Sequence, residues 1–131
     1  MTKKALLIVD DNYDSLHAIA SMVASFGYEA RTFQDGVAAL TALKDDAAQG
    51  RCIDLALLDI TMPTMNGYEL LAALKQMPQY ASLSCIMVTA RDQDDQILEG
   101  YQYGADYYIT KPFTSQQLKY GIELFLGGAN V

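Results

Sequence analysis

The sequence has few of the residues that bind soft metals or form disulfides. It contains two cysteines and one histidine, with no C-x-x-C pair. Structural zinc sites need several cysteine or histidine ligands, so this scarcity argues against such a site. We expect Cys52 and Cys85 to be reduced and mostly buried thiols of a cytosolic protein.

Long apolar runs and positive charges are scarce as well. No apolar run approaches the ~20 residues that span a bilayer. The basic start at residues 1–4 precedes only five apolar residues, too few for the core of a signal peptide, so we expect a cytoplasmic protein. Nine lysines and arginines against sixteen acids give a net charge of −7. This balance argues against direct binding to nucleic acid or to an anionic membrane.

The remaining composition is that of one globular domain. Hydrophobic residues make up 51% of the 131 positions, and charged residues make up 19%. A chain of this size buries enough surface to fold without disulfides or structural metals. We expect one domain over residues 1–126, followed at 127–131 by a flexible tail or the start of a linker.

Short apolar segments alternate with segments of helical period along the chain. Continuous apolar runs are typical of strands that are buried on both faces of a parallel sheet. The predicted strands are 5–9, 28–33, 55–58, 85–88 and 106–109. The predicted helices contain 16–23, with Gly27 as a C-terminal cap, then 37–43, 68–74, 97–101 and 118–125. This order predicts an α/β fold, a flavodoxin-like doubly wound (βα)5 with a five-stranded parallel sheet and helices on both faces.

Polar residues follow four of the predicted strands. They are three carboxylates, a hydroxyl and an ammonium group, from Asp10, Asp11, Asp59, Thr89 and Lys111. Because the carboxyl ends of parallel strands meet at one edge of a sheet, we expect these groups to converge there. Clustered carboxylates favour a hard cation, above all Mg²⁺. An aspartate nucleophile with a cation, a lysine and a hydroxyl can hold a transferring phosphoryl group. A single aspartate after a strand could instead be a helix N-cap.

Four segments in this order and spacing resemble the response-regulator receiver domain of two-component signalling systems. The resemblance covers nearly the whole chain, from about residue 4 to residue 126. The segments that carry it are 7–12 (LIVDDN), 57–67 (LLDITMPTMNG), 87–90 (MVTA) and 104–113 (GADYYITKPF).

The resemblance implies a role for each residue of the site. Asp59 matches the phosphoacceptor, which takes its phosphoryl group from a sensor histidine kinase or a histidine phosphotransfer protein. Mg²⁺, with Mn²⁺ as a possible substitute, is implied as the cofactor. Its implied ligands are the carboxylates of Asp10, Asp11 and Asp59 and the backbone carbonyl of Thr61.

Further residues are implied to bind the phosphoryl group and to switch. The phosphoryl contacts match the Thr89 hydroxyl, the Ala90 N–H and Lys111, and the Lys111-Pro112 bond is implied to be cis. Tyr108 matches an aromatic ring that moves inward when Thr89 swings toward the phosphoryl group, although the pattern also fits an ordinary half-buried tyrosine.

Two positions that vary in the family flank the path of the hydrolytic water. They are Thr61 and Arg91, which we expect to tune the lifetime of the phosphoryl group. Arg91 could equally be a solvated residue at a helix start. On this reading the chain catalyses only its own phosphorylation and dephosphorylation.

The last two predicted helices and the last predicted strand are rich in aromatic residues. The set is Tyr101, Tyr103, Tyr107, Tyr108, Tyr120 and Phe125. About half of these rings could belong to the core. We expect the others to form a phosphorylation-sensitive face for a homodimer or a downstream partner. Lys119 is the one base there, which disfavours a regulator that dimerises through this face to bind DNA.

Other functions remain possible from the sequence. A haloacid-dehalogenase-type aspartyl-phosphate hydrolase shares the aspartate, the Mg²⁺ and the lysine, but it needs an acid where this chain has Thr61. A flavodoxin needs a phosphate-binding first loop, and the acids of residues 10–12 would repel a phosphate. A receiver that never accepts a phosphoryl group usually lacks one of the five site residues. Within the receiver reading, the chain could be a stand-alone regulator or a receiver excised from a longer one whose output domain is missing.

Overall fold

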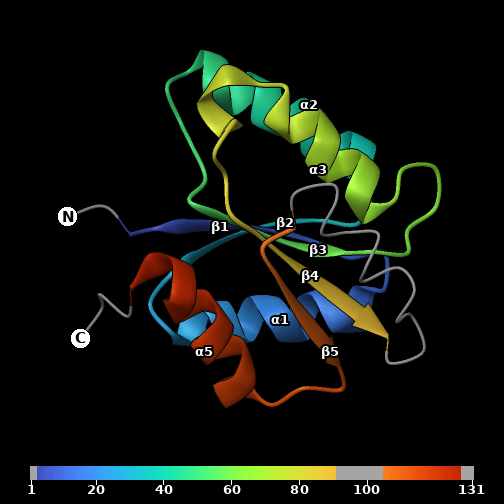
Figure 1. Ribbon diagram of the computed structural model, residues 1–131, viewed down its shortest axis with the longest axis vertical. Helices are drawn as coiled ribbons and strands as arrows, with labels where there is room; N and C mark the ends of the chain where they lie inside the picture. Colours follow the sequence, from blue (N-terminus) through green and yellow to red (C-terminus); the bar gives the residue numbers. More distant parts are fainter. Residues whose placement is uncertain (1–2, 91–104, 128–131) are drawn as a thin grey trace.

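Figure 1 shows the computed structural model, which describes residues 3–90 and 105–127. One sheet of five strands crosses the molecule in the order β2-β1-β3-β4-β5, and every neighbouring pair is parallel. The chain reverses its direction across the sheet between β1 and β3, as in other doubly wound sheets. The fold class predicted from the sequence is confirmed. The strands are β1 Ala5–Val9, β2 Glu29–Phe33, β3 Leu55–Asp59, β4 Cys85–Ala90 and β5 Tyr107–Lys111.

Helices cover both faces of this sheet. In Figure 1, α2 and α3 lie above the sheet, and α1 and α5 lie below it. The helix predicted around 97–101 lies outside the described residues. The described helices are α1 Tyr13–Ser25, α2 Gly36–Ala48, α3 Gly67–Lys75, the 3-10 turn η1 Pro78–Tyr80, and α5 Ser115–Leu126.

The central strands supply the core on both faces, which is why their sequences are continuously apolar. Leu7 and Val9 of β1 pack toward α2 and α3, whereas Leu6 and Ile8 of the same strand pack toward α1 and α5. All four are at most 1% exposed. A strand with only one buried face would alternate apolar and polar residues instead.

Polar residues close the ends of the helices. Asn12, Asp35, Asn66 and Thr114 are the N-caps of α1, α2, α3 and α5, and each side chain accepts a backbone N–H of the first turn. Gly27, with φ of +95°, follows the last residues of α1, as the sequence predicts. The cap of α1 is therefore Asn12, and neither Asp10 nor Asp11 has that role.

The two cysteines differ in exposure. Cys85 is buried, but Cys52 is exposed, so the prediction that both thiols are mostly buried is wrong for Cys52. Cys52 follows α2 in the segment that leads to β3, where the chain passes over the surface. Among the described helices, none combines the length and the apolar character that crossing a bilayer requires.

Candidate functional site

The predicted site residues lie along the carboxyl edge of the sheet. Asp10 directly follows β1, and its N–H donates to the Phe33 carbonyl at 3.2 Å. Asp59 ends β3 and lies in register with Val88 of β4. Beyond that pair, Thr89 lies opposite Thr110, and the Ala90 backbone lies opposite Lys111. Four strands thus bring together residues that are up to 101 positions apart in the chain.

The three carboxylates form one cluster. One oxygen from each of Asp10, Asp11 and Asp59 lies within 4.8 Å of the others. Asp10 is only 1% exposed, Asp59 is half-buried and Asp11 is exposed, so the cluster reaches from the sheet to solvent. Oxygen ligands at this spacing suit a hard cation such as Mg²⁺, which keeps part of its water shell when it binds. The cluster is compatible with a Mg²⁺ site.

Asp10 already uses both carboxylate oxygens within the protein. Its Oδ1 accepts the Asn12 N–H at 2.9 Å, and its Oδ2 accepts from Lys111 Nζ at 2.8 Å. The Lys111 side chain is 29% exposed, whereas Asp10 is buried. The ammonium group therefore offsets the buried charge of Asp10 and lies at the margin of the acid cluster.

The pKa of Asp59 is raised to about 7, mainly by burial. The charges of Asp10 and Asp11 contribute to this rise, while Lys111 and a hydrogen bond from the Thr61 backbone N–H oppose it. Without a cation, Asp59 is thus only partly ionised at neutral pH. A bound cation would favour its charged form.

We expect Asp59→Asn to stabilise the metal-free protein above pH 7. An acid whose pKa is higher in the folded state than in the unfolded chain binds more protons when folded. Its contribution to stability therefore falls as the pH rises from about 4 to 7. After allowance for solvent screening at this half-buried group, Asp59→Asn should raise the free energy of unfolding by about 1–2 kcal/mol at pH 8. Thermal unfolding in chelator at pH 5 and pH 8 measures the effect, and an equal gain at both pH values would contradict the assignment.

The loop after Asp59 leaves no room for a side chain at Gly67. A Cβ at this position would lie 2.4 Å from the Asp59 carbonyl oxygen and 3.2 Å from the Ile60 Cα. The Gly67 N–H also donates to the Ile60 carbonyl at 2.9 Å. The first turn of α3 is therefore seated directly on the backbone of the predicted phosphoacceptor.

Gly67→Ala is accordingly expected to destabilise the protein. The clash is with backbone atoms, so the added methyl group must displace either α3 or the end of β3. We expect a loss of about 2–4 kcal/mol in the free energy of unfolding. Urea unfolding of the variant measures it, with Gly50→Ala as the comparison. A Cβ at Gly50 meets no atom within 4 Å, so the cost there comes from its positive φ of +79° alone, about 1 kcal/mol. A loss at Gly67 no greater than that at Gly50 would show that the close approach is relaxed in solution.

The two predicted switch residues lie on the two strands beyond the phosphoacceptor strand β3. Thr89 belongs to β4, which pairs with β3, and is 1% exposed. Tyr108 belongs to β5, which pairs with β4. Tyr108 is half-buried and packs against the apolar cluster between the sheet and α2 and α3. Its hydroxyl lies 3.1 Å from the hydroxyl of Tyr68. No sequence pattern predicts this contact, because Tyr68 fits the apolar face of a helix and its partner is 40 residues away.

The remaining predicted residues are placed as follows. Thr61 is exposed in the loop after β3, and the Lys111-Pro112 peptide bond is cis. The residues Arg91, Tyr101 and Tyr103 lie outside the part of the chain that the structure describes.

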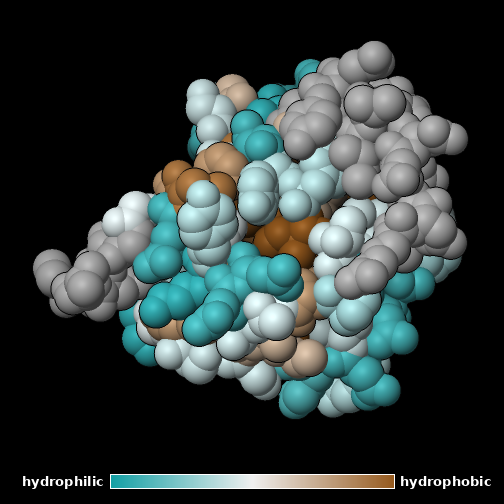
Figure 2. Space-filling model, turned by 60° about the horizontal axis from the view of Figure 1, so that its bottom comes forward, coloured by the Kyte–Doolittle hydropathy of each residue, from teal (hydrophilic) through white to brown (hydrophobic). Residues whose placement is uncertain are grey.

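The aromatic residues on β5 and α5 divide between core and surface. Tyr107 packs edge-on against Phe125, with ring centroids 6.4 Å apart, on the α1 and α5 side of the sheet. Tyr120 is 61% exposed. A cavity of about 390 Å³ lies between β5 and α5, lined in part by Tyr107, Tyr108 and Tyr120. Figure 2, which brings the lower side of Figure 1 forward, shows hydrophobic surface at the base of a hollow among more polar side chains.

Comparison with known proteins points to one family. Residues 6–123 match the family model of the response regulator receiver domain. The transcriptional regulatory protein PhoB of Pseudomonas aeruginosa is 36% identical over 118 residues, which are 90% of this chain and 49% of that protein. The sensory transduction protein RegX3 of Mycobacterium tuberculosis is 35% identical over 114 residues, which are 87% of this chain and 47% of that protein. This chain thus spans about half the length of these relatives.

The fold also matches solved structures. The chemotaxis protein CheY4 of Vibrio cholerae superposes with a TM-score of 0.84 at 27% identity, covering 95% of this chain and 99% of that one. A structure of NtrX from Brucella abortus superposes with a TM-score of 0.85 at 28% identity, covering 96% of this chain but only 27% of that one. The same fold therefore occurs both as a whole chain and as part of a longer one.

Proposed function

This chain belongs to the response regulator receiver domains of two-component systems, and on that premise we propose that Asp59 accepts a phosphoryl group and thereby switches the molecule. The observation that supports the assignment most directly is the acid cluster. Asp59 ends its strand within 4.8 Å of two further carboxylates, and Lys111 lies at the margin of that cluster. The donor would be the phosphohistidine of a sensor histidine kinase or of a histidine phosphotransfer protein.

The donor set fits a Mg²⁺ ion, with Mn²⁺ as a substitute. Asp11 and Asp59 would bind it directly, together with the backbone carbonyl of Thr61. Asp10 would contribute mainly by its charge and through water, since Lys111 and the Asn12 N–H occupy its oxygens. When bound, the cation would neutralise the clustered carboxylates and stabilise charge on the phosphoryl oxygens.

The chemical step proposed for Asp59 is a phosphoryl transfer to its carboxylate. A carboxylate oxygen forms the new O–P bond while the P–N bond of the phosphohistidine breaks, and the electron pair leaves with the imidazole nitrogen. Lys111 would exchange its contact with Asp10 for one with a phosphoryl oxygen. The Thr89 hydroxyl and the Ala90 N–H would donate to the other oxygens. These donors would stabilise the negative charge on the phosphoryl oxygens during the transfer. Hydrolysis of the acyl phosphate would later reset the switch.

The proposed switch couples Thr89 to Tyr108. Thr89 moving toward the phosphoryl group would free further space beside β5 and so favour the inward position of the Tyr108 ring. Such a modification shifts an equilibrium only by its different interactions with the two states. Thr61 and Arg91 are proposed to set the phosphoryl lifetime, by their positions beside the path of the attacking water.

The proposed output is a change of the face to which β5 and α5 contribute; the helix predicted around 97–101, which the sequence assigns to the same face, lies outside the described residues. The exposed ring of Tyr120 and the cavity beside it support a docking role for this face. Its partner would be a downstream protein, a second copy of the chain or an output domain of a longer regulator. Receivers are signalling switches rather than metabolic enzymes, so catalysis here would be confined to the domain's own phosphorylation and dephosphorylation.

We also propose that residues 1–126 form the receiver unit, that 127–131 serve as a tail or linker, and that the protein works in the cytoplasm. The relatives' greater length supports the view that a receiver of this kind can sit within a longer regulator. The match of residues 6–123 to the receiver family leaves no observation in favour of a haloacid-dehalogenase-type hydrolase.

Intact-mass spectrometry after incubation with Mg²⁺ and acetyl phosphate tests this function. We expect one phosphoryl adduct per chain, which disappears when the cation is chelated and is absent from Asp59→Asn. Asp54→Asn is the matched control, because Asp54 is an exposed acid whose Oδ2 accepts the Ala5 N–H, away from the cluster. A native protein without an adduct, or an adduct that survives in Asp59→Asn, would overturn the proposal.

A further inference from the structure

Tyr68 lies where a fixed part of the site meets the proposed switch. It is the second residue of α3, directly after Gly67, which sits against the Asp59 backbone. Asn66 and Glu69 hold this first turn through reciprocal hydrogen bonds of 2.9 Å. Tyr68 itself is only 6% exposed. Its ring is therefore fixed in position relative to the phosphoacceptor.

Tyr108 is the less constrained partner of the pair. It lies on β5, in register with Met87 of β4, and it is only half-buried. Its hydroxyl reaches the Tyr68 hydroxyl at 3.1 Å, and its ring packs on the same apolar cluster that contains Tyr68. If the Tyr108 ring turned outward, this hydroxyl contact would break, and its contribution to the inward position would be lost.

We infer that Tyr68 is a positioning residue of the switch, whose hydroxyl holds the Tyr108 ring inward against α3 before phosphorylation. The inference rests on the proposed function, since it concerns the same Thr89 and Tyr108 equilibrium. The new element is the contact that Tyr68 of α3, the helix after the phosphoacceptor loop, makes with Tyr108. The unphosphorylated chain would thus already favour the inward ring, and phosphorylation would add to an existing bias.

The size of this bias follows from the chemistry of one hydrogen bond. A hydroxyl pair of this kind contributes about 1 kcal/mol net, which changes a two-state ratio by roughly fivefold. If a ligand binds only the inward state, its apparent affinity is proportional to the population of that state. A fivefold loss of the inward state can therefore weaken binding by up to about fivefold. Tyr68→Phe removes the hydroxyl and keeps the ring, so the packing of α3 should remain.

Binding of beryllofluoride, an analogue of the phosphoryl group, provides the test. Its dissociation constant would be measured by calorimetry in Mg²⁺ for the native chain, Tyr68→Phe, Tyr108→Phe and the double variant. We expect each single variant to bind about two- to fivefold more weakly. The double variant should bind no more weakly than either single variant, because all three lack the same hydrogen bond.

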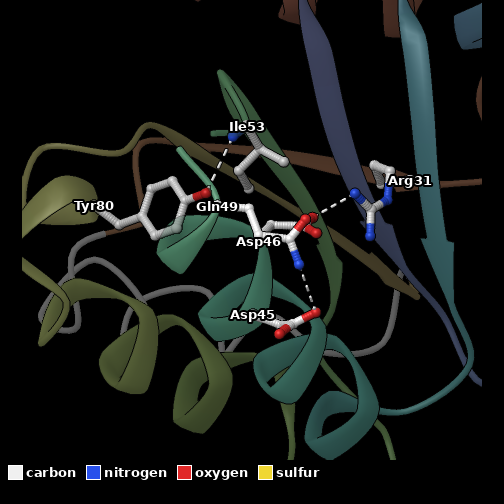
Figure 3. Close-up of polar contacts among 6 residues, drawn as sticks. All are labelled: Arg31, Asp45, Asp46, Gln49, Ile53 and Tyr80. Atoms are coloured by element: carbon white, nitrogen blue, oxygen red, sulfur yellow. Dashed lines mark hydrogen bonds and ion pairs between the residues drawn. The ribbon is translucent and has the colours of Figure 1, made fainter. Parts of the chain in front are cut away.

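Tyr80→Phe is the matched control. Tyr80 is a second buried tyrosine whose hydroxyl accepts a hydrogen bond, from the Ile53 N–H at 3.1 Å, and Figure 3 shows this contact beside the Arg31–Asp46 ion pair. Loss of its hydroxyl should lower thermal stability without changing beryllofluoride affinity. A general loss of stability would therefore not imitate the expected result.

The outcomes separate the two proposals. If the native chain binds no beryllofluoride and takes no phosphoryl group, the proposed function fails. If the native chain binds it but Tyr68→Phe binds equally well or more tightly, the function stands and the role of Tyr68 is wrong. Additive losses in the double variant would also overturn that role, since they would show that the two hydroxyls act independently.

Discussion

Lys111→Met is expected to slow the phosphorylation of Asp59 by about two to three orders of magnitude. This is the usual effect of removing one donor that stabilises the charge developing in a transition state. Lys111 Nζ contacts Asp10 at 2.8 Å, at the margin of the acid cluster, and methionine keeps the length of the side chain without its charge. The initial rate of adduct formation with acetyl phosphate, followed by intact mass, measures the effect.

Stability should change in the same variant. Asp10 is buried, and in the part of the chain that the structure describes its ion-pair partner is Lys111. Because Lys111 is partly exposed, we expect a loss of about 1–3 kcal/mol rather than the full cost of breaking a buried pair. Rates should therefore be compared at a temperature at which both proteins remain folded. Lys119→Met, at an exposed lysine of α5, is the control and should change neither quantity. Phosphorylation of Lys111→Met at the native rate would remove Lys111 from the site.

Asp11→Asn is expected to weaken Mg²⁺ binding by at least about tenfold, because it replaces a charged ligand by a neutral one. Asp11 is the exposed member of the cluster, so the fold should tolerate the change. Titration of Mg²⁺ into the metal-free protein by calorimetry measures the affinity. Phosphorylation should then require a correspondingly higher Mg²⁺ concentration.

Asp14→Asn is the control for this second prediction. Asp14 is also an exposed acid near the start of α1, but it is not part of the cluster. It should alter Mg²⁺ affinity only slightly, through the change in net charge. Equal losses in the two variants would mean that Mg²⁺ responds to overall charge rather than to a built site.

The sequence predicted the strands well because strands buried on both faces consist almost entirely of apolar residues. The predicted bounds of β1 are those observed, since all but its first residue are fully buried. The ends of β4 and β5 extend further than predicted, to Ala90 and Lys111. Polar site residues such as Thr89 and Lys111 continue the ladder there, and hydropathy alone places them outside a strand. The residues proposed to bind the phosphoryl group thus lie where the local signal for a strand is weakest.

The positions of the site residues could be predicted, but their partners could not. Parallel strands bring their carboxyl ends together, so the convergence of Asp10 and Asp59 follows from topology. The pairing of Lys111 with Asp10, rather than with Asp59, depends on side-chain reach across 101 positions. The contact of Tyr68 with Tyr108 likewise depends on how α3 is seated, which is set by Gly67. Such contacts have no periodic signature.

The acidic residues outside the cluster have structural contacts of their own. Asp46 is buried against Arg31. Asp54 and Asp106 accept the N–H groups that begin β1 and β4, at 2.8 and 2.9 Å. These acids satisfy backbone donors at the amino edge of the sheet. The described acids thus include a cluster at the carboxyl edge of the sheet and structural contacts at the amino edge.

The location of the phosphoryl group tests the central claim most directly. The protein would be phosphorylated with acetyl phosphate and Mg²⁺, treated with borohydride, digested and mapped by mass spectrometry. Borohydride reduces an acyl phosphate to an alcohol, so we predict homoserine at position 59 and unmodified aspartate at positions 10 and 11. A reduced residue at another position, or none in a protein that carries the adduct, would contradict the assignment of Asp59 as the phosphoacceptor.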